Sequence, residues 1–185
     1  VTQTQADTWT PLGESLFQIY TYFMPRTLAD MPLGVDASTP FPRYQYEDTD
    51  DGPYTTNMSI VPEDPVQYEC QRNFVVIVTD GEPTMDDFDS DPNATAQGFD
   101  DYDDLIGDYH ADGETEVPPD PFGIESALYL DDIAKYMAER DCRPDLPDDQ
   151  RIDVYTIGFS TNGPANDLLE KAADEGNGIF YTSNN

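Results

Sequence analysis

Cationic residues are scarce in this sequence. Only 8 Lys and Arg stand against 39 Asp and Glu, so the formal net charge is −31 for 185 residues. Nucleic-acid binding depends on clustered cations and on the counterions that they release, so this composition excludes a nucleic-acid partner and disfavours binding to anionic membrane surfaces. Long apolar runs are missing as well. The longest one, residues 74–78, is far shorter than the roughly 20 residues of a membrane-spanning helix, so we expect no direct membrane insertion.

Cysteine is also rare, and the two cysteines, Cys70 and Cys142, do not have the short spacing of a zinc site. In an oxidising compartment they can form one disulfide, which would close a loop of about 70 residues and stabilise the fold by roughly 4 kcal/mol in the chain-entropy model. Two buried free thiols are the alternative. The sequence leaves both open.

The acidic residues are spread along the chain and do not form a single tail. Such a solvated anionic surface is typical of a protein that works in high salt, where ions screen the self-repulsion of the charges. A more specific interpretation is a calcium site, because Asp87, Asp89 and Asp91 alternate as in the first half of a calcium-binding loop. Gly98 occupies the position of the final Glu of such a loop, so a solvated insertion also remains open.

Hydrophobic spacing predicts helices and strands in alternation, joined by two loop-rich, acidic insertions at about 25–70 and 82–121. We expect no core residue in the first insertion. The alternation predicts an α/β fold with a doubly wound, mainly parallel sheet flanked by helices, and ligands at the carboxyl ends of its strands. The predicted elements are a helix over 10–23, a strand over 73–79 that is buried on both faces, a helix from about 124 to Arg140, a strand over 151–159, a helix over 166–173 and a strand over 178–182.

Four segments together resemble the von Willebrand factor A domain, in the version found at the front of PilY-type type IV pilus tip adhesins, which are pilus-biogenesis factors. The resemblance covers most of the predicted helices and strands but neither insertion. The segments are TPLGESLFQIYTYF at 10–23, VVIVTDGEPT at 75–84, LDDIAKYMAERDCRPDLPDDQRIDVYTIGF at 130–159 and LLEKAADEGNGIFYTSNN at 168–185.

The resemblance implies a Rossmann-like fold with a metal-ion-dependent adhesion site. Thr10 and Asp80 match the threonine and the aspartate of that site, and Glu82 is a lower-ranked candidate beside them. The family's DxSxS element is not visible, because the near match at residues 36–39 follows Thr10 instead of preceding it. We therefore expect residues 1–185 to form a single partial domain that lacks the early strands and the final helix.

The residues themselves are compatible with this site and with simpler roles. Mg²⁺ and Ca²⁺ take oxygen ligands, which a Thr hydroxyl and an Asp carboxylate supply. Thr10 before Pro11 is equally a helix N-cap, and Asp80-Gly81 is equally a turn at a strand end. The chemistry alone does not separate these alternatives.

The resemblance implies an extracellular module of a pilus tip or cell surface, secreted through the periplasm and without catalytic activity. It would bind a host or abiotic surface ligand and contact minor pilins or the rest of the adhesin chain. One alternative is a structural, salt-adapted filament or surface-assembly domain with an inactive metal site. Another is a metal-dependent hydrolase built around Asp80, although the only histidine, His110, has no visible Ser or Cys partner.

Overall fold

The computed structural model describes residues 12–24, 65–80, 106–107, 109, 129–159, 161 and 163–183. The predicted order of helices and strands is confirmed, with shifts at the element ends; the third predicted element, for example, begins at Leu130 and not near residue 124. The elements are α1 (Leu12–Phe23), β1 (Asn73–Thr79), α4 (Leu130–Glu139), β2 (Ile152–Phe159), α5 (Gly163–Glu175) and β3 (Phe180–Ser183).

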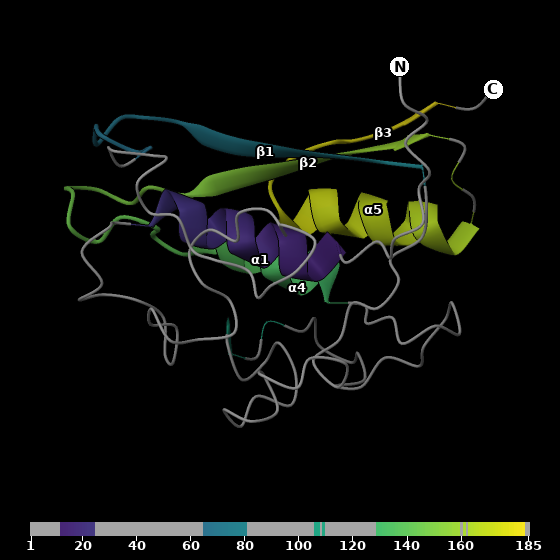
Figure 1. Cartoon of the computed structure of the whole chain (residues 1–185), viewed down its shortest axis with the longest axis horizontal. Coiled ribbons are helices and arrows are strands. Elements are labelled where there is room, and N and C mark those ends of the chain that lie inside the picture. Colours follow the sequence, from purple (N-terminus) through teal and green to yellow (C-terminus); the bar gives the residue numbers. More distant parts are fainter. Residues whose placement is uncertain are drawn as a thin grey trace, which may run out of the picture.

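The described strands form a parallel sheet in the order β1-β2-β3, shown in Figure 1. The β1–β2 register runs from Asn73 opposite Ile152 to Thr79 opposite Gly158. Parallel neighbours need a crossover connection, and in sequence α4 lies between β1 and β2 and α5 between β2 and β3. The predicted mixed α/β class with a parallel sheet is therefore confirmed, and the carboxyl ends of the strands share one edge.

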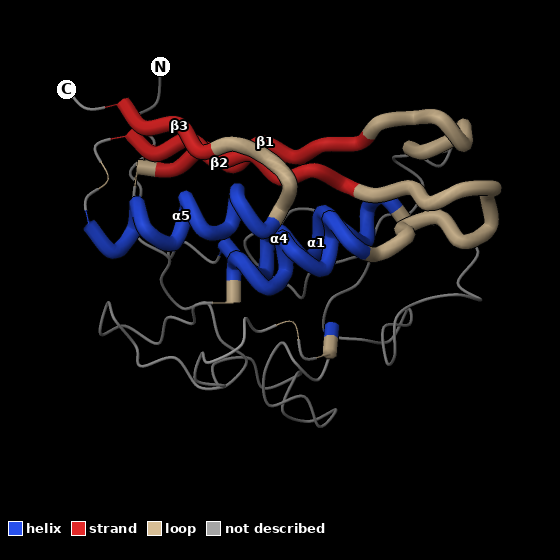
Figure 2. Tube along the Cα trace, turned by 180° about the vertical axis from the view of Figure 1, so that it is seen from behind, coloured by secondary structure: helices blue, strands red, loops and turns tan. Residues whose placement is uncertain are grey.

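The helices α1, α4 and α5 all lie on the same face of the sheet (Figures 1 and 2). Burial alternates along β1, and Phe74, Val76 and Val78 are 64%, 49% and 57% exposed. The prediction that this strand is buried on both faces is therefore wrong. A short apolar run has the same sequence whether one layer or two cover it, so periodicity cannot distinguish these cases.

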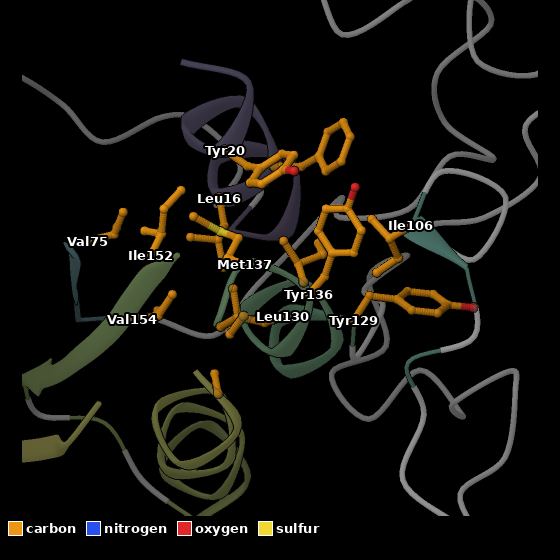
Figure 3. Packing of buried hydrophobic residues seen from close by; sticks show 14 of the residues in the cluster. Leu16, Tyr20, Val75, Ile106, Tyr129, Leu130, Tyr136, Met137, Ile152 and Val154 are labelled. Carbon is orange, nitrogen blue, oxygen red and sulfur yellow. The ribbon is translucent and has the colours of Figure 1, made fainter. Parts of the chain in front are cut away.

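The core fills the space between the helices and the covered face of the sheet (Figure 3). Leu16 of α1, Met137 of α4 and Ile152 of β2 are almost fully buried in it. The rings of Tyr20 and Tyr136 pack edge to face with centroids 4.9 Å apart, a favoured aromatic geometry. These contacts bury the apolar stripes of α1 and α4 against each other and against β2.

Residues of both predicted insertions also belong to this core. Val66 is fully buried and Ile106 is 6% exposed, while the ring of Tyr109 packs against Tyr136 with centroids 5.2 Å apart. The expectation that residues 25–70 carry no core residue is therefore wrong for Val66. A single apolar residue among polar neighbours has no periodicity, which is why the sequence pattern did not reveal it.

Two ion pairs connect α4 to α5. Lys171 Nζ lies 2.8 Å from Asp131 Oδ2, and Lys135 Nζ lies 3.6 Å from Glu175 Oε2. Burial and the neighbouring Asp132 carboxylate raise the pKa of Asp131 to about 7, although its position in the first turn of α4 and the Lys171 ammonium favour the charged form. The Asp131 carboxylate is buried, but the Lys171 side chain is 37% exposed, so solvent screens this pair and it adds little to stability.

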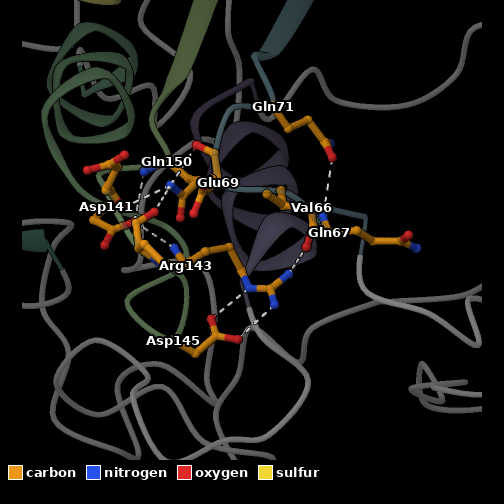
Figure 4. A network of polar contacts seen from close by, with 10 residues as sticks. Val66, Gln67, Glu69, Gln71, Asp141, Arg143, Asp145 and Gln150 are labelled. Carbon is orange, nitrogen blue, oxygen red and sulfur yellow. Dashed lines mark hydrogen bonds and ion pairs between the residues drawn. The ribbon is translucent and has the colours of Figure 1, made fainter.

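A polar network joins the segments that precede β1 and β2 (Figure 4). The buried Arg143 guanidinium donates two hydrogen bonds to the Asp145 carboxylate, of 2.7 and 2.8 Å, and lowers its pKa. It also donates to the carbonyl of Val66, and Gln150 Nε2 donates to the carbonyl of Glu69 at 3.2 Å. We call these five residues the Arg143 clasp, which fixes the amino edge of the sheet.

We expect Arg143→Ala to lower the free energy of unfolding by about 2 kcal/mol, because it leaves the buried Val66 carbonyl without its donor. Arg151→Ala is the matched control: its ion pair with Asp149 spans 2.8 Å but is half exposed, so its loss should cost less than about 0.5 kcal/mol. Urea unfolding followed by circular dichroism measures both. Equal stabilities for the two variants would show that the clasp does not stabilise this edge.

Candidate functional site

Asp80 directly follows β1 at the carboxyl edge of the sheet. The residue before it, Thr79, is buried and pairs in register with Gly158 of β2, whereas Asp80 is exposed. The prediction that Asp80 stands at the end of a parallel strand is therefore confirmed. Ligands of open α/β sheets bind outside the carboxyl ends of the strands, so this carboxylate is in a suitable place for ligand binding.

Thr161 and Asn166 form a second polar group at this edge, which sequence reasoning missed. The Thr161 hydroxyl donates a hydrogen bond to Asn166 Oδ1, and Asn166 Nδ2 donates to the Thr161 carbonyl at 3.4 Å. Thr161 is the second residue after β2, whereas Asp80 is the first after β1, and Asn166 lies in the first turn of α5. The same carboxyl-edge rule could have identified both residues.

Gly158 allows Thr161 to approach the end of β2. A Cβ at this position would meet Thr161 Oγ1 well inside van der Waals contact and would lie 3.3 Å from Leu169 Cδ1 and 3.4 Å from Asn166 Oδ1. Only glycine leaves this space free while the Thr161–Asn166 contact is kept. The residue therefore shapes the edge without itself offering a ligand atom.

We expect Gly158→Ala to turn the Thr161 side chain away from Asn166 and to lower the free energy of unfolding by about 1–3 kcal/mol through overpacking. Gly163→Ala at the start of α5 is the control, because a Cβ there meets nothing within 4 Å. Urea unfolding compares the two variants. If Gly158→Ala is as stable as Gly163→Ala, the close approach of Thr161 to residue 158 does not contribute to the stability of the fold.

The candidate metal-ligand atoms at this edge are side-chain oxygens, and oxygen ligands are those that Mg²⁺ and Ca²⁺ prefer. In the part of the chain that the structure describes, no group of three or more His, Cys, Asp and Glu residues could hold a metal ion. Asp80 alone is therefore only a fraction of a coordination shell. The other predicted metal ligands lie outside the described residues, so the structure does not place them: Thr10, Glu82, Asp87, Asp89 and Asp91.

The two cysteines belong to the opposite edge, on the segments that the Arg143 clasp joins. Both are free thiols in the structure, with Cys70 exposed and Cys142 buried, so the disulfide considered from the sequence is not formed in it. The alternative of two buried thiols describes only Cys142. Burial, together with the nearby Asp141 carboxylate, raises the pKa of the Cys142 thiol to about 12.

We expect a maleimide reagent at pH 7.5 to label Cys70 rapidly and Cys142 only after unfolding, because the reactive thiolate of Cys142 is both buried and scarce. Intact mass before and after addition of urea counts the labels. Protein isolated under non-reducing conditions that takes up no label until a reductant is added would instead show a Cys70–Cys142 disulfide.

Comparisons of the chain with protein-family models, with curated proteins and with solved structures found no match. Among the described helices, none has the length and apolar character needed to cross a membrane.

Proposed function

We propose that this chain is a von Willebrand factor A-like module of an extracellular, PilY-type pilus tip adhesin, which binds a ligand or surface through a divalent cation at the carboxyl edge of its sheet. The observation that supports this most directly is the exposed Asp80 carboxylate at the end of β1, on the edge that also carries Thr161 and Asn166. The fold that belongs to this proposal is doubly wound.

In this proposal the Asp80 carboxylate and the Thr10 hydroxyl hold Mg²⁺ or Ca²⁺, directly or through water, with Glu82 as a lower-ranked neighbour. A cation that has few anionic protein ligands remains electrophilic, so a carboxylate of the bound partner can complete its shell. Adhesion would then require the metal.

The proposed partners are a host or abiotic surface ligand at the metal edge and minor pilins, or the rest of the adhesin chain, elsewhere on the module. The proposed location is the pilus tip or the cell surface, reached through the periplasm. The charge of −31 also favours a second candidate function, a salt-adapted structural domain of a filament or surface layer whose metal site is inactive.

The experiment is a calorimetric titration of Mg²⁺ and Ca²⁺ into the wild type, Asp80→Ala, Thr10→Ala and Asp174→Ala. Asp174 is the control, because it is an exposed carboxylate near the end of α5, next to the turn that leads into β3, and its removal changes the net charge by the same amount as Asp80→Ala. We expect Asp80→Ala and Thr10→Ala each to weaken the tightest site at least 10-fold and Asp174→Ala to leave it unchanged.

If Asp80→Ala and Asp174→Ala bind both cations like the wild type, cation binding is diffuse and the adhesion proposal fails. The structural candidate then takes its place. Titration at 0.15 M NaCl keeps diffuse cation binding to the acidic surface weak, because exposed charges are screened beyond about 8 Å at that ionic strength.

A further inference from the structure

The turn that leads from α5 into β3 (Figure 1) contains an exposed asparagine followed by glycine, Asn177–Gly178. In such a pair the backbone nitrogen of the glycine can attack the side-chain amide carbon of the asparagine, because glycine has no side chain to hinder the approach. A bond forms between Gly178 N and Asn177 Cγ, and the Cγ–Nδ2 bond breaks. The amide proton of Gly178 leaves with Nδ2 as ammonia, and water opens the resulting cyclic imide to aspartate or isoaspartate. The reaction needs no reagent except water.

The attacking nitrogen is already engaged in the structure. Gly178 N donates a hydrogen bond to the carbonyl of Ala173 at 2.8 Å, and Asn177 N donates to the carbonyl of Asp174 at 3.3 Å. These two bonds form a Schellman motif, which ends helix α5 with Asn177 in the left-handed conformation at a φ of 58°. Before Gly178 N can reach Asn177 Cγ, it has to give up its bond to Ala173 and the peptide unit has to rotate. The cap of α5 therefore has to open first.

Contacts with β2 hold the same turn closed. Val154 N donates to the carbonyl of Gly176 at 2.8 Å, and Thr156 N donates to the carbonyl of Ile179 at 3.3 Å. Gly178 packs so closely on this strand that a Cβ there would lie well inside van der Waals contact with the Val154 carbonyl oxygen. Opening of the cap disrupts these contacts as well. We therefore expect it to accompany local or global unfolding.

The Asn177 side chain is matched to a carboxylate of β2. Asn177 Nδ2 donates to Asp153 Oδ1 at 2.8 Å. An ionised aspartate at position 177 has no hydrogen to donate and would place a second negative charge beside Asp153. An isoaspartate adds a CH₂ to the main chain just before Gly178, where the backbone packs against Val154. Both products of deamidation therefore disfavour the closed turn.

We propose that Asn177 is a modification site that the folded chain protects and that deamidates when the cap of α5 opens. The product then weakens the attachment of β3 to β2, because the turn that leads into β3 no longer closes in its original form. Deamidation thereby makes a transient opening irreversible and limits the lifetime of the folded state. This site lies beside the amino end of β2 and does not depend on the proposed metal function.

The experiment follows deamidation of the wild type at pH 8 in buffer and in concentrated guanidinium chloride. Peptide mapping by mass spectrometry detects the mass change of an amide that becomes an acid. The chain contains a second pair of the same sequence, Asn162–Gly163, which serves as the rate standard in denaturant. We expect both pairs to react at similar rates in denaturant, and Asn177 to react at least about 10-fold more slowly in buffer, because only the open state reacts.

Two substitutions test the consequence for the fold. Asn177→Asp reproduces one product, whereas Asn177→Gly is the control, because glycine adopts the left-handed conformation without strain and carries no amide. We expect Asn177→Asp to unfold at a lower urea concentration than the wild type and Asn177→Gly. The double substitution Asn177→Asp with Asp153→Asn should recover part of that loss, since it removes the repulsion between the two carboxylates.

Equal rates for Asn177 in buffer and in denaturant would overturn the proposal, since the cap would then give no protection. Reaction of Asn162 but not of Asn177 in denaturant would overturn the assignment of the modification site. An Asn177→Asp variant as stable as the wild type would overturn the proposed effect on the attachment of β3.

Discussion

The parallel pairing of β1 with β2 is the constraint on which the rest of the structure depends. It aligns Asn73 with Ile152 and Thr79 with Gly158, segments far apart in the sequence. Because parallel neighbours cannot be joined by a tight turn, the chain between them must cross one face of the sheet, and α4 lies on that face. The pairing thereby creates the core, and it also gathers the carboxyl ends of the strands at one edge and their amino ends at the other.

The two edges have different chemistry. At the amino edge, Arg143 is buried and fully engaged with Asp145 and Val66, and Gln150 is nearly inaccessible to solvent. Buried charges with satisfied partners resist movement because separating them leaves a costly unpaired group. At the carboxyl edge Asp80 is exposed, so this carboxylate can interact with a cation or a partner. The contacts at the amino edge therefore stabilise the fold, whereas the carboxyl edge is available for binding.

The helices and strands could be predicted from sequence because their signals are local. Leu16 and Tyr20 repeat at helical spacing, and the β-branched run before Asp80 gives both the strand and the residue at its end. The exposure of one face of β1 and the burial of Val66 could not be predicted from such local signals. Burial of an apolar residue depends on which layer packs against it, and the spacing of apolar residues in the sequence does not contain this information. The Thr161–Asn166 contact was missed because it depends on the close approach that Gly158 permits.

The amino-acid sequence by itself determined the net charge of −31, the order of the elements and the position of Asp80 after a strand. These follow from composition and short-range periodicity, which every segment carries with it. Only the tertiary structure decided which face of the sheet is covered, that the Arg143 guanidinium reaches the Val66 carbonyl 77 positions away, and that Cys142 is buried while Cys70 is exposed. The physical reason is that burial and pairing are properties of contacts between distant segments, which exist only once β1 and β2 lie side by side.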